Sequence, residues 1–277
     1  MTLEELIRQA LSEDIGDGDH TTLATVPADA VGKVKMLVKQ KGVISGIEVV
    51  KEVFGQLDRA VNIRSFYQDG DRVEKGDVIM ILEGPSRSLL TGERLALNFI
   101  QRMSGIATYT AQIVEKLEGT KTTLLDTRKT TPCNRIVEKM AVKHGGAQNH
   151  RFGLFDMIMI KDNHVDFAGG ITPAIKAVQR YLKEKHKDLK IEVEVRSFDE
   201  LNEVLITGGV HRIMLDNFTP DQIRKALTLI QGKYETEASG GITIENIRSY
   251  AETGVDFISV GALTHQIKSL DISIVTL

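Results

Sequence analysis

The chain has 277 residues, and 42% of them are hydrophobic, which suffices for one large buried core or two modest ones. Its formal net charge of -3 excludes the global basic field typical of nucleic-acid-binding proteins, so any cluster of cations must be local. The single cysteine, Cys133, excludes an intrachain disulfide and a cysteine-based zinc site. A thiol nucleophile stays open, but an incidental cysteine is the simpler interpretation.

The N-terminal residues 1–16 form an amphipathic pattern with acidic residues, which predicts a helix and not a signal peptide. No apolar run approaches the roughly 20 residues that a membrane span needs. We therefore expect a soluble, cytoplasmic protein with no membrane partner. The acidic stretch EDIGDGDHTT at 13–22 is interpreted as a solvated loop, since it lacks the glutamate spacing of a calcium-binding loop.

Residues 33–83 alternate apolar and polar side chains, as in VKMLVKQ and DVIMILEG, and QDGD and EKGD supply turn signals between the runs. This pattern predicts an antiparallel sheet with one face in water. A helix is expected next, from about Gly92 to Leu117, because apolar residues recur there at three to four positions. Gly105 is expected to kink or interrupt it.

From about residue 120, short apolar runs alternate with helical segments, which is typical of a parallel sheet. The expected strands are 122–126, 157–161, 191–195, 212–216, 234–238 and 256–260. The chain lacks the glycine fingerprint of a doubly wound dinucleotide-binding sheet, so an α/β barrel is favoured. The domain boundary is expected near the long helix.

Cations gather where these strands end, which is where α/β barrels carry their active sites. The cations in question are Arg128, Lys129, His150, Arg151 and Lys161. Arginine offers a planar fork to carboxylates and phosphates, and lysine a point charge. The group therefore predicts a polyanionic ligand. The alternative is that these are solvated loop cations, or salt-bridge partners of Asp126 and Asp162.

Acidic residues follow on the middle strands. Glu192 and Glu194 lie two positions apart and so face the same way, which is costly inside a barrel unless they are paired or near its rim. Glu194 and Asp216 could hold Mg²⁺ or bind sugar hydroxyls, because carboxylate oxygens suit both. The alternative is a structural ion pair with Arg196 or Lys161.

Glycines follow the late strands. ASGGIT is expected to lead into a helix near Thr243, and SVGALTH follows the last strand of the series. Backbone N–H groups in such loops often bind phosphate, and glycine permits close approach. The residues alone thus predict a ligand, or two adjoining ligands, with carboxylates at one end and phosphate at the other.

Taken together, these motifs resemble the quinolinate phosphoribosyltransferase family nearly end to end. They include GERLALNFIQRMSGIAT, DTRKTTP, KHGGAQNHR, IKDNH, EVEV, LDNF and SGGI. The resemblance implies a type II phosphoribosyltransferase fold, with an N-terminal α/β sandwich over 1–110 and an irregular open α/β barrel over 111–277. The C-terminal segment is expected to pack on the first domain. It further implies Mg²⁺ as cofactor, and a homodimer or a hexamer of dimers with shared active sites.

The family reaction joins quinolinate to phosphoribosyl pyrophosphate and yields nicotinate mononucleotide, pyrophosphate and CO₂ in NAD biosynthesis. By motif, quinolinate would be bound by Thr127, Arg128, Lys129, His150, Arg151 and Lys161, with Arg94 of a partner subunit. Glu194 and Asp216 would serve the ribose and the metal-bound pyrophosphate, and with Lys129 and Lys161 they form the expected catalytic set. The 5′-phosphate would be held by Ser239, Gly240, Gly241, Val260, Gly261 and Ala262.

Three alternatives stay open at this point. A relative on the same scaffold, of the molybdenum-transport-associated kind, would act on another substrate. A Schiff-base aldolase would use Lys161 as nucleophile. A non-catalytic sensor would bind quinolinate without turnover.

Overall fold

The computed structural model describes residues 1–277, which form two compact units. The first unit comprises residues 1–112, 130–147 and 263–277, and the second comprises 113–129 and 148–262. The chain thus returns to the first unit twice after leaving it. No helix of the chain combines the length and the apolar character that crossing a bilayer requires.

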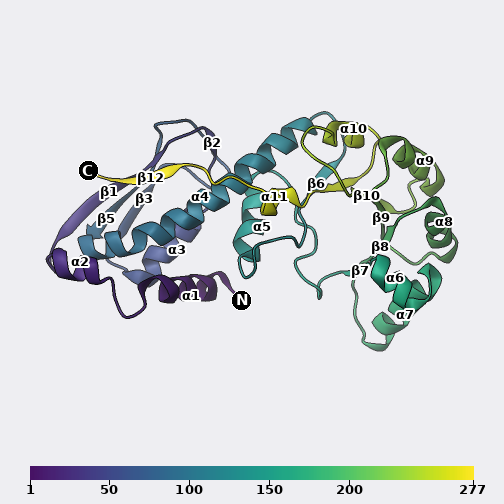
Figure 1. Ribbon diagram of the computed structural model, residues 1–277, viewed down its shortest axis with the longest axis horizontal. Helices are drawn as coiled ribbons and strands as arrows, with labels where there is room; N and C mark the ends of the chain where they lie inside the picture. Colours follow the sequence, from purple (N-terminus) through teal and green to yellow (C-terminus); the bar gives the residue numbers. More distant parts are fainter. The chain divides into compact units, whose positions relative to one another are not determined.

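The first unit is built around a four-stranded antiparallel sheet. The sheet predicted over residues 33–83 is confirmed for the alternating apolar runs, but residues 47–57 within that range form a helix that was not predicted. Its strands, in sheet order, are β12 (Ile272–Thr276), β1 (Val31–Val38), β5 (Val78–Pro85) and β3 (Asn62–Ser65). Figure 1 shows β12, the last strand of the chain, alongside β1. A two-stranded ribbon joins β2 (Gly42–Val43) to β4 (Arg72–Val73). Met36, Met80 and Leu82 are fully buried, so the sheet has one core-facing side.

The first unit also contains helices, which are α1 (Leu3–Ile15), α2 (His20–Thr25), α3 (Ile47–Leu57), α4 (Ser86–Lys116) and α5 (Arg135–His144). The loop predicted over 13–22 is wrong at both ends, since α1 and α2 reach into it. Asp19 explains the second helix, because its carboxylate accepts a hydrogen bond from Thr22 N at 3.0 Å and so caps the start of α2.

Helix α4 runs through Gly105 without a break, so the predicted interruption there is wrong. The glycine has a packing role instead. A Cβ atom at this position would lie 2.3 Å from the carbonyl oxygen of Lys268. Gly105 is therefore required because the C-terminal segment crosses the helix at backbone contact distance.

The second unit contains a six-stranded parallel sheet, as predicted. Its strands, in sheet order, are β6 (Thr123–Leu125), β11 (Phe257–Ser259), β10 (Glu235–Ser239), β9 (Arg212–Asp216), β8 (Ile191–Val195) and β7 (Ile158–Ile160). The edge strands β6 and β7 do not pair with each other, so the sheet is an open barrel. Near-continuous burial of Val193, Val195, Ile213 and Leu215 accounts for the apolar runs in the sequence.

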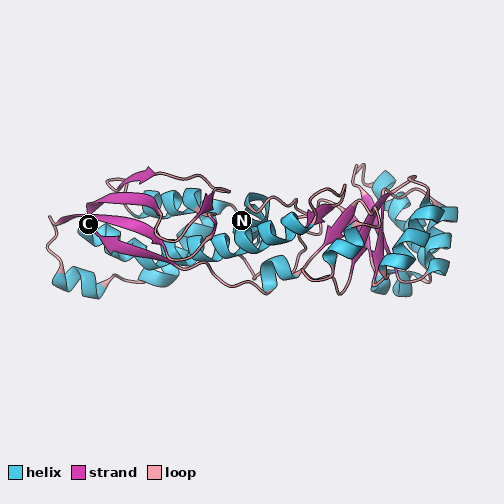
Figure 2. Cartoon of the chain, turned by 90° about the horizontal axis from the view of Figure 1, so that it is seen from above, coloured by secondary structure: helices cyan, strands magenta, loops and turns pink.

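Helices follow the strands along the outer side of this sheet, as Figures 1 and 2 show. They are α6 (Asp162–Ala168), α7 (Ile171–Glu184), α8 (Phe198–Thr207), α9 (Pro220–Ile230) and α10 (Ile247–Ala251), and the short α11 (Ala262–His265) follows β11. The helix expected near Thr243 begins only at Ile247. Residues 243–246 form a turn instead, in which the Asn246 side chain accepts from Thr243 N at 2.8 Å and donates to Gly241 O at 3.1 Å.

Asp256 ties three segments together at the amino-terminal edge of the parallel sheet. One carboxylate oxygen accepts from Thr236 N at 3.0 Å and from the Thr236 hydroxyl at 2.7 Å, and the other accepts from Lys121 Nζ at 2.8 Å. Burial alone would raise the pKa of Asp256, but these hydrogen bonds lower it below its usual value.

Asp256→Asn is therefore expected to lower the free energy of unfolding by about 1 kcal/mol at neutral pH, since the side chain is partly exposed. A lowered folded-state pKa stabilises the protein above the pKa of an unfolded aspartate and loses this effect as the pH falls. The difference from the unmutated protein should thus shrink below about pH 4. Urea unfolding at several pH values measures it. Asp17→Asn, at a side chain that is 93% exposed, should change nothing at any pH.

Candidate active site

The strand register places a polar stripe on one face of the parallel sheet. Glu192 of β8 lies beside Arg212 of β9, which lies beside Glu235 of β10. Two residues further along each strand come Glu194 and Glu237, and after them the neighbours Asp216 and Ser239. Because side chains two apart in a strand share a face, all of these residues lie on the same side. Near the carboxyl ends of the strands, this face is therefore acidic.

Lys161 forms an ion pair with Glu194 at the start of α6. The lysine side chain is 42% exposed and the glutamate side chain only 8%. Of the two ion pairs considered for Glu194, the pair with Lys161 is confirmed. The pair with Arg196 is wrong, because Arg196 instead binds Glu200 at 2.7 Å and Asp166 at 3.3 Å. Glu194 thus holds the Lys161 ammonium at the edge of the site.

The charges of Arg128 and Arg151 interact, although the two residues are 23 positions apart in the chain. The pKa of Arg151 is lowered, first by burial and then by the positive charge of Arg128. The Arg151 guanidinium donates to the Met157 carbonyl at 3.2 Å. Lys129 follows Arg128 on the same exposed loop, and its N–H donates to the Thr127 hydroxyl at 3.0 Å. The two segments that carry the predicted cations lie side by side, since Gln148 N donates to the carbonyl of Leu124 at 3.0 Å.

Asp126 is the link between these two segments. It follows strand β6 directly, its side chain is fully buried, and its carboxylate accepts from His150 N at 2.8 Å. From the sequence, Asp126 was expected only as a salt-bridge partner for the loop cations. The structure shows instead that it anchors the backbone of the segment that carries His150 and Arg151.

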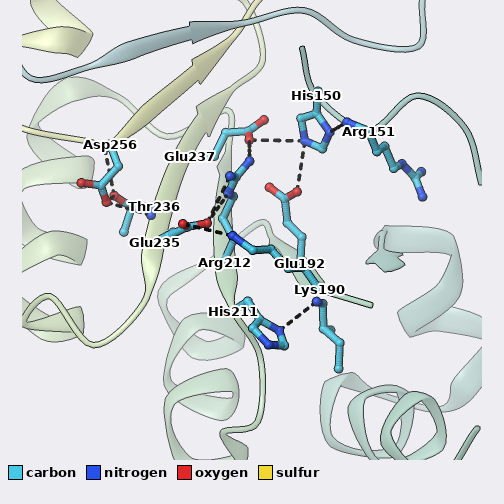
Figure 3. A network of polar contacts seen from close by, with 11 residues as sticks. His150, Arg151, Lys190, Glu192, His211, Arg212, Glu235, Thr236, Glu237 and Asp256 are labelled. Atoms are coloured by element: carbon cyan, nitrogen blue, oxygen red, sulfur yellow. Dashed lines mark hydrogen bonds and ion pairs between the residues drawn. The ribbon is translucent and has the colours of Figure 1, made fainter. Parts of the chain in front are cut away.

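His150 lies over two buried glutamates, as Figure 3 shows. Its Nε2 atom is 3.1 Å from Glu192 and 3.4 Å from Glu237. Burial alone would lower the pKa of His150, but the two glutamates raise it to about 9. Burial, and then the charge of Glu237, raise the pKa of Glu192 to about 7. Glu192 is thus paired, as its burial in a barrel interior requires.

Arg212 extends this cluster towards the opposite edge of the sheet (Figure 3). Its guanidinium lies 3.1 Å from Glu237 and 3.1 Å from Glu235, and it stacks 4.0 Å from the centre of the Phe257 ring. Neither Arg212 nor Glu237 was predicted from the sequence. The alternation of Glu235, Glu237 and Ser239 was the available signal, because it repeats the alternation of Glu192 and Glu194 on the same face.

His150, Glu192 and Glu237 place one ligand atom each within 4.8 Å of one another, as a metal site would require. The cluster does not suit a metal ion in this state, because Arg212 already neutralises Glu237 and the histidine proton faces the carboxylates. Glu194 and Asp216 offer the hard carboxylate oxygens that Mg²⁺ prefers. Both already have protein partners, so they fit a hydrated Mg²⁺ better than a fully dehydrated one.

Asp216 belongs to a tightly bonded loop beside the glycine pair. Its carboxylate accepts from the Ser239 hydroxyl at 2.9 Å and from the Asn217 amide at 2.7 Å. Gly240 has φ +87°, and a Cβ atom there would lie 2.2 Å from the Asn217 side chain. Gly241 also has a positive φ, +63°, but a Cβ atom there would meet nothing within 4 Å.

The other predicted small-residue loop follows β11. Val260 is buried, and its N–H donates to the carbonyl of Leu125 at 3.0 Å, so this loop starts beside the end of β6. Gly261 and Ala262 come next and are partly exposed. Arg94 lies elsewhere, on α4 in the first unit, with an exposed side chain. It is not among the residues that this sheet edge brings together.

Comparisons with known proteins identify one family over nearly the whole chain. Residues 19–104 match the model of the quinolinate phosphoribosyl transferase N-terminal domain, and residues 106–275 match that of its C-terminal domain. The chain is 44% identical to a probable nicotinate-nucleotide pyrophosphorylase [carboxylating] from Bacillus subtilis, over 99% of this chain and 93% of that one. It is 42% identical to the mitochondrial quinolinate phosphoribosyltransferase [decarboxylating] 2b of Nicotiana tabacum, over 98% and 81%. A crystal structure of NadC from Streptococcus pyogenes superposes with a TM-score of 0.93 at 40% identity, covering 99% of this chain and 97% of that one.

Proposed function

The chain belongs to the quinolinate phosphoribosyltransferase family, and we propose that the carboxyl edge of its parallel sheet binds quinolinate beside phosphoribosyl pyrophosphate. The enzyme is a pentosyltransferase of NAD biosynthesis. It transfers the phosphoribosyl group to quinolinate with loss of CO₂, and so gives nicotinate mononucleotide and pyrophosphate. The fold is that of the family, as expected from the sequence.

The assignment of the quinolinate end rests on the junction of the two arginine-bearing segments, which Asp126 joins through its hydrogen bond to His150 N and where the charges of Arg128 and Arg151 interact. Two arginines are held close together only at a cost, and a bound dicarboxylate removes that cost. Quinolinate carries two adjacent carboxylates, which match the two guanidinium groups. The proposed binding set is Thr127, Arg128, Lys129, His150, Arg151 and Lys161.

Glu194 and Asp216 form the acidic side of the proposed site. Cleavage of the bond from C1 to pyrophosphate develops positive charge on the ribose, and carboxylates nearby stabilise that charge. Mg²⁺, when bound, neutralises charge on the pyrophosphate leaving group. Glu194 forms an ion pair with Lys161, and Asp216 is oriented by Ser239 and Asn217. No covalent enzyme intermediate is required, since positioning and electrostatics supply the catalysis.

Decarboxylation follows the transfer in this proposal. Loss of CO₂ leaves a carbanion next to the ring nitrogen, which has become a pyridinium cation. That positive charge stabilises the carbanion, and Arg128, Lys129 and Arg151 add further positive charge on the same side. The ring then takes up a proton from solvent.

The glycine pair supports a phosphate site, and two neighbouring variants test it. Gly240→Ala places a methyl group against Asn217 and should disturb the loop that orients Asp216. We expect the KM for phosphoribosyl pyrophosphate to rise by about tenfold or more. Gly241→Ala meets no neighbour and carries only backbone strain, of about 1 kcal/mol. Its KM should change less, and equal effects from both variants would contradict the steric explanation.

A direct assay tests the function itself. Purified protein with quinolinate, phosphoribosyl pyrophosphate and Mg²⁺ should release CO₂ and form nicotinate mononucleotide. Nicotinate in place of quinolinate should fail, because it lacks the second carboxylate. Absence of product at saturating substrate would refute the proposal.

A Schiff-base aldolase is the main catalytic alternative, and the structure argues against it. A lysine nucleophile needs a free amine, whereas the Lys161 amine is engaged in an ion pair with Glu194. Borohydride with carbonyl substrates should therefore trap no adduct on Lys161. The complete set of cations also disfavours a relative with another substrate, and turnover in the direct assay would exclude a simple sensor.

We further propose that the enzyme works as a homodimer, or as a hexamer of dimers, in which Arg94 of the partner subunit completes the quinolinate site. The exposure of Arg94 on α4 supports this proposal, since a buried side chain could not reach another chain. A cytoplasmic location is likewise proposed. The tobacco relative, by contrast, is named as mitochondrial.

A further inference from the structure

The barrel interior contains a charged layer where such barrels usually carry branched apolar residues. Glu192 and Glu237 are both fully buried, and His150 and Arg212 lie against them. Replacing buried ionic groups by apolar ones of similar size is often neutral or stabilising. Stability alone therefore does not account for these two glutamates, which leaves a role in fixing the positions of neighbouring side chains.

Both ring nitrogens of His150 have partners within the protein. Nε2 faces Glu192 and Glu237, and Nδ1 accepts from the backbone N–H of Arg151 at 2.6 Å. The Arg151 contact favours a neutral ring with its proton on Nε2, whereas the glutamates favour the charged ring. In either state, Nε2 carries a proton that points at the carboxylates. The ring is thus held through both of its nitrogens.

The same residue is anchored from three strands. Asp126, directly after β6, binds its backbone N–H, Glu192 belongs to β8, and Glu237 belongs to β10. The next residue in the chain is Arg151, whose guanidinium lies close to Arg128 and binds the Met157 carbonyl. Any rotation of the His150 segment would therefore move Arg151.

From this geometry we propose that Glu192 and Glu237 are positioning residues, which hold His150 and thereby aim Arg151 at the carboxylates of quinolinate. The proposal rests on the proposed function, because it assigns to Arg151 a quinolinate contact. It assigns no chemical step to either glutamate. Their role differs from that of Glu194, which lies on the same strand as Glu192 but binds Lys161 at the edge of the site.

The two glutamates differ in how firmly they are held. Glu237 is also bound by Arg212 at 3.1 Å, an ion pair that Glu192 does not make, and each glutamate has an Oε1 atom with no hydrogen-bond partner. Glu237 should therefore be the more important of the two. Glu235 supplies a matched control, because it lies on the same strand and face as Glu237 and binds Arg212, but does not contact His150.

The test uses Glu192→Gln, Glu237→Gln, the double variant and the control Glu235→Gln in the full-length enzyme. The KM for quinolinate should rise by about tenfold or more in the double variant, with the larger share from Glu237→Gln. The KM for phosphoribosyl pyrophosphate should stay within about twofold. Glu235→Gln should leave both KM values unchanged. Calorimetric titration with quinolinate should show the same order of affinities without turnover.

Coupling to Arg151 separates positioning from general damage to the fold. Glu237→Gln should have almost no further effect on the quinolinate KM when Arg151 is already alanine, because it acts through that residue. Additive effects would overturn the proposal, and so would an unchanged quinolinate KM in the variants. If the double variant does not fold, the single variants and this cycle decide the matter. An inactive wild-type enzyme would refute the proposed function instead, since the present proposal requires a working site.

Discussion

Replacing Lys161 with alanine is expected to lower kcat/KM for quinolinate by about 10³-fold or more, because it removes a substrate cation and leaves Glu194 as an uncompensated buried acid. Glu194 has only 8% of its side chain exposed, so solvent cannot replace the ammonium group. The remaining carboxylate would repel the carboxylates of quinolinate. Steady-state kinetics with each substrate varied in turn measures the effect.

Lys190→Ala is the control for this prediction. Lys190 also pairs with a glutamate of the same unit, Glu235, but its side chain is 59% exposed, so solvent screens the pair. Activity should stay within about twofold of the unmutated enzyme. A second variant, Lys161→Ala with Glu194→Gln, should recover quinolinate binding in part, since the uncompensated charge is gone. If Lys161→Ala alone retained most activity, Lys161 would have to be removed from the site.

The strand ends of the barrel could be predicted from the sequence because strands buried on both faces form short, nearly continuous apolar runs. The runs at 191–195 and 212–216 coincide with β8 and β9. Once the strands are placed, the side chains that follow them must meet at one edge, and so Arg128, Lys129 and Lys161 could be expected there in advance. The contact between Lys161 and Glu194 was one of two candidates, and only the register could choose between them.

The layer beneath the rim could not be predicted in the same way. Glu237 lies within an expected strand, but a single polar residue in a strand can face water as well as the interior. Which face it takes depends on the pairing of β9 with β10, a contact between residues 23 positions apart in the chain. His150 raised a similar difficulty, because its motif suggested a ligand contact and said nothing of the acids beneath it.

Packing between distant segments explains the other differences. Gly105 resembled a helix breaker, yet the close approach of Lys268 was the reason for it. The strand β12 was not predicted as such, because ISIVT at the end of the chain becomes a strand by pairing with β1. The local sequence sets the preference of a segment for helix or strand, and tertiary contacts determine which structure the segment adopts.

Mixing two inactive variants should restore activity if the active sites are shared. Arg94→Ala and Lys161→Ala should each be nearly inactive alone, because both remove a cation from the proposed quinolinate site. In a symmetric dimer, each site would take Arg94 from one subunit and Lys161 from the other. A mixed dimer then has one site with both defects and one site with none.

The expected recovery is quantitative. Random exchange makes half of the dimers mixed, so about one quarter of the sites are intact and about a quarter of the activity should return. Co-expression with two affinity tags isolates the mixed dimers, in which half of the sites should work. Pairing Lys161→Ala with Arg128→Ala is the control, because both residues belong to the parallel-sheet unit of one chain and leave every site of the mixed dimer with a defect. Equal activity from the two pairings would count against sharing, since Arg94 would then have to serve its own subunit.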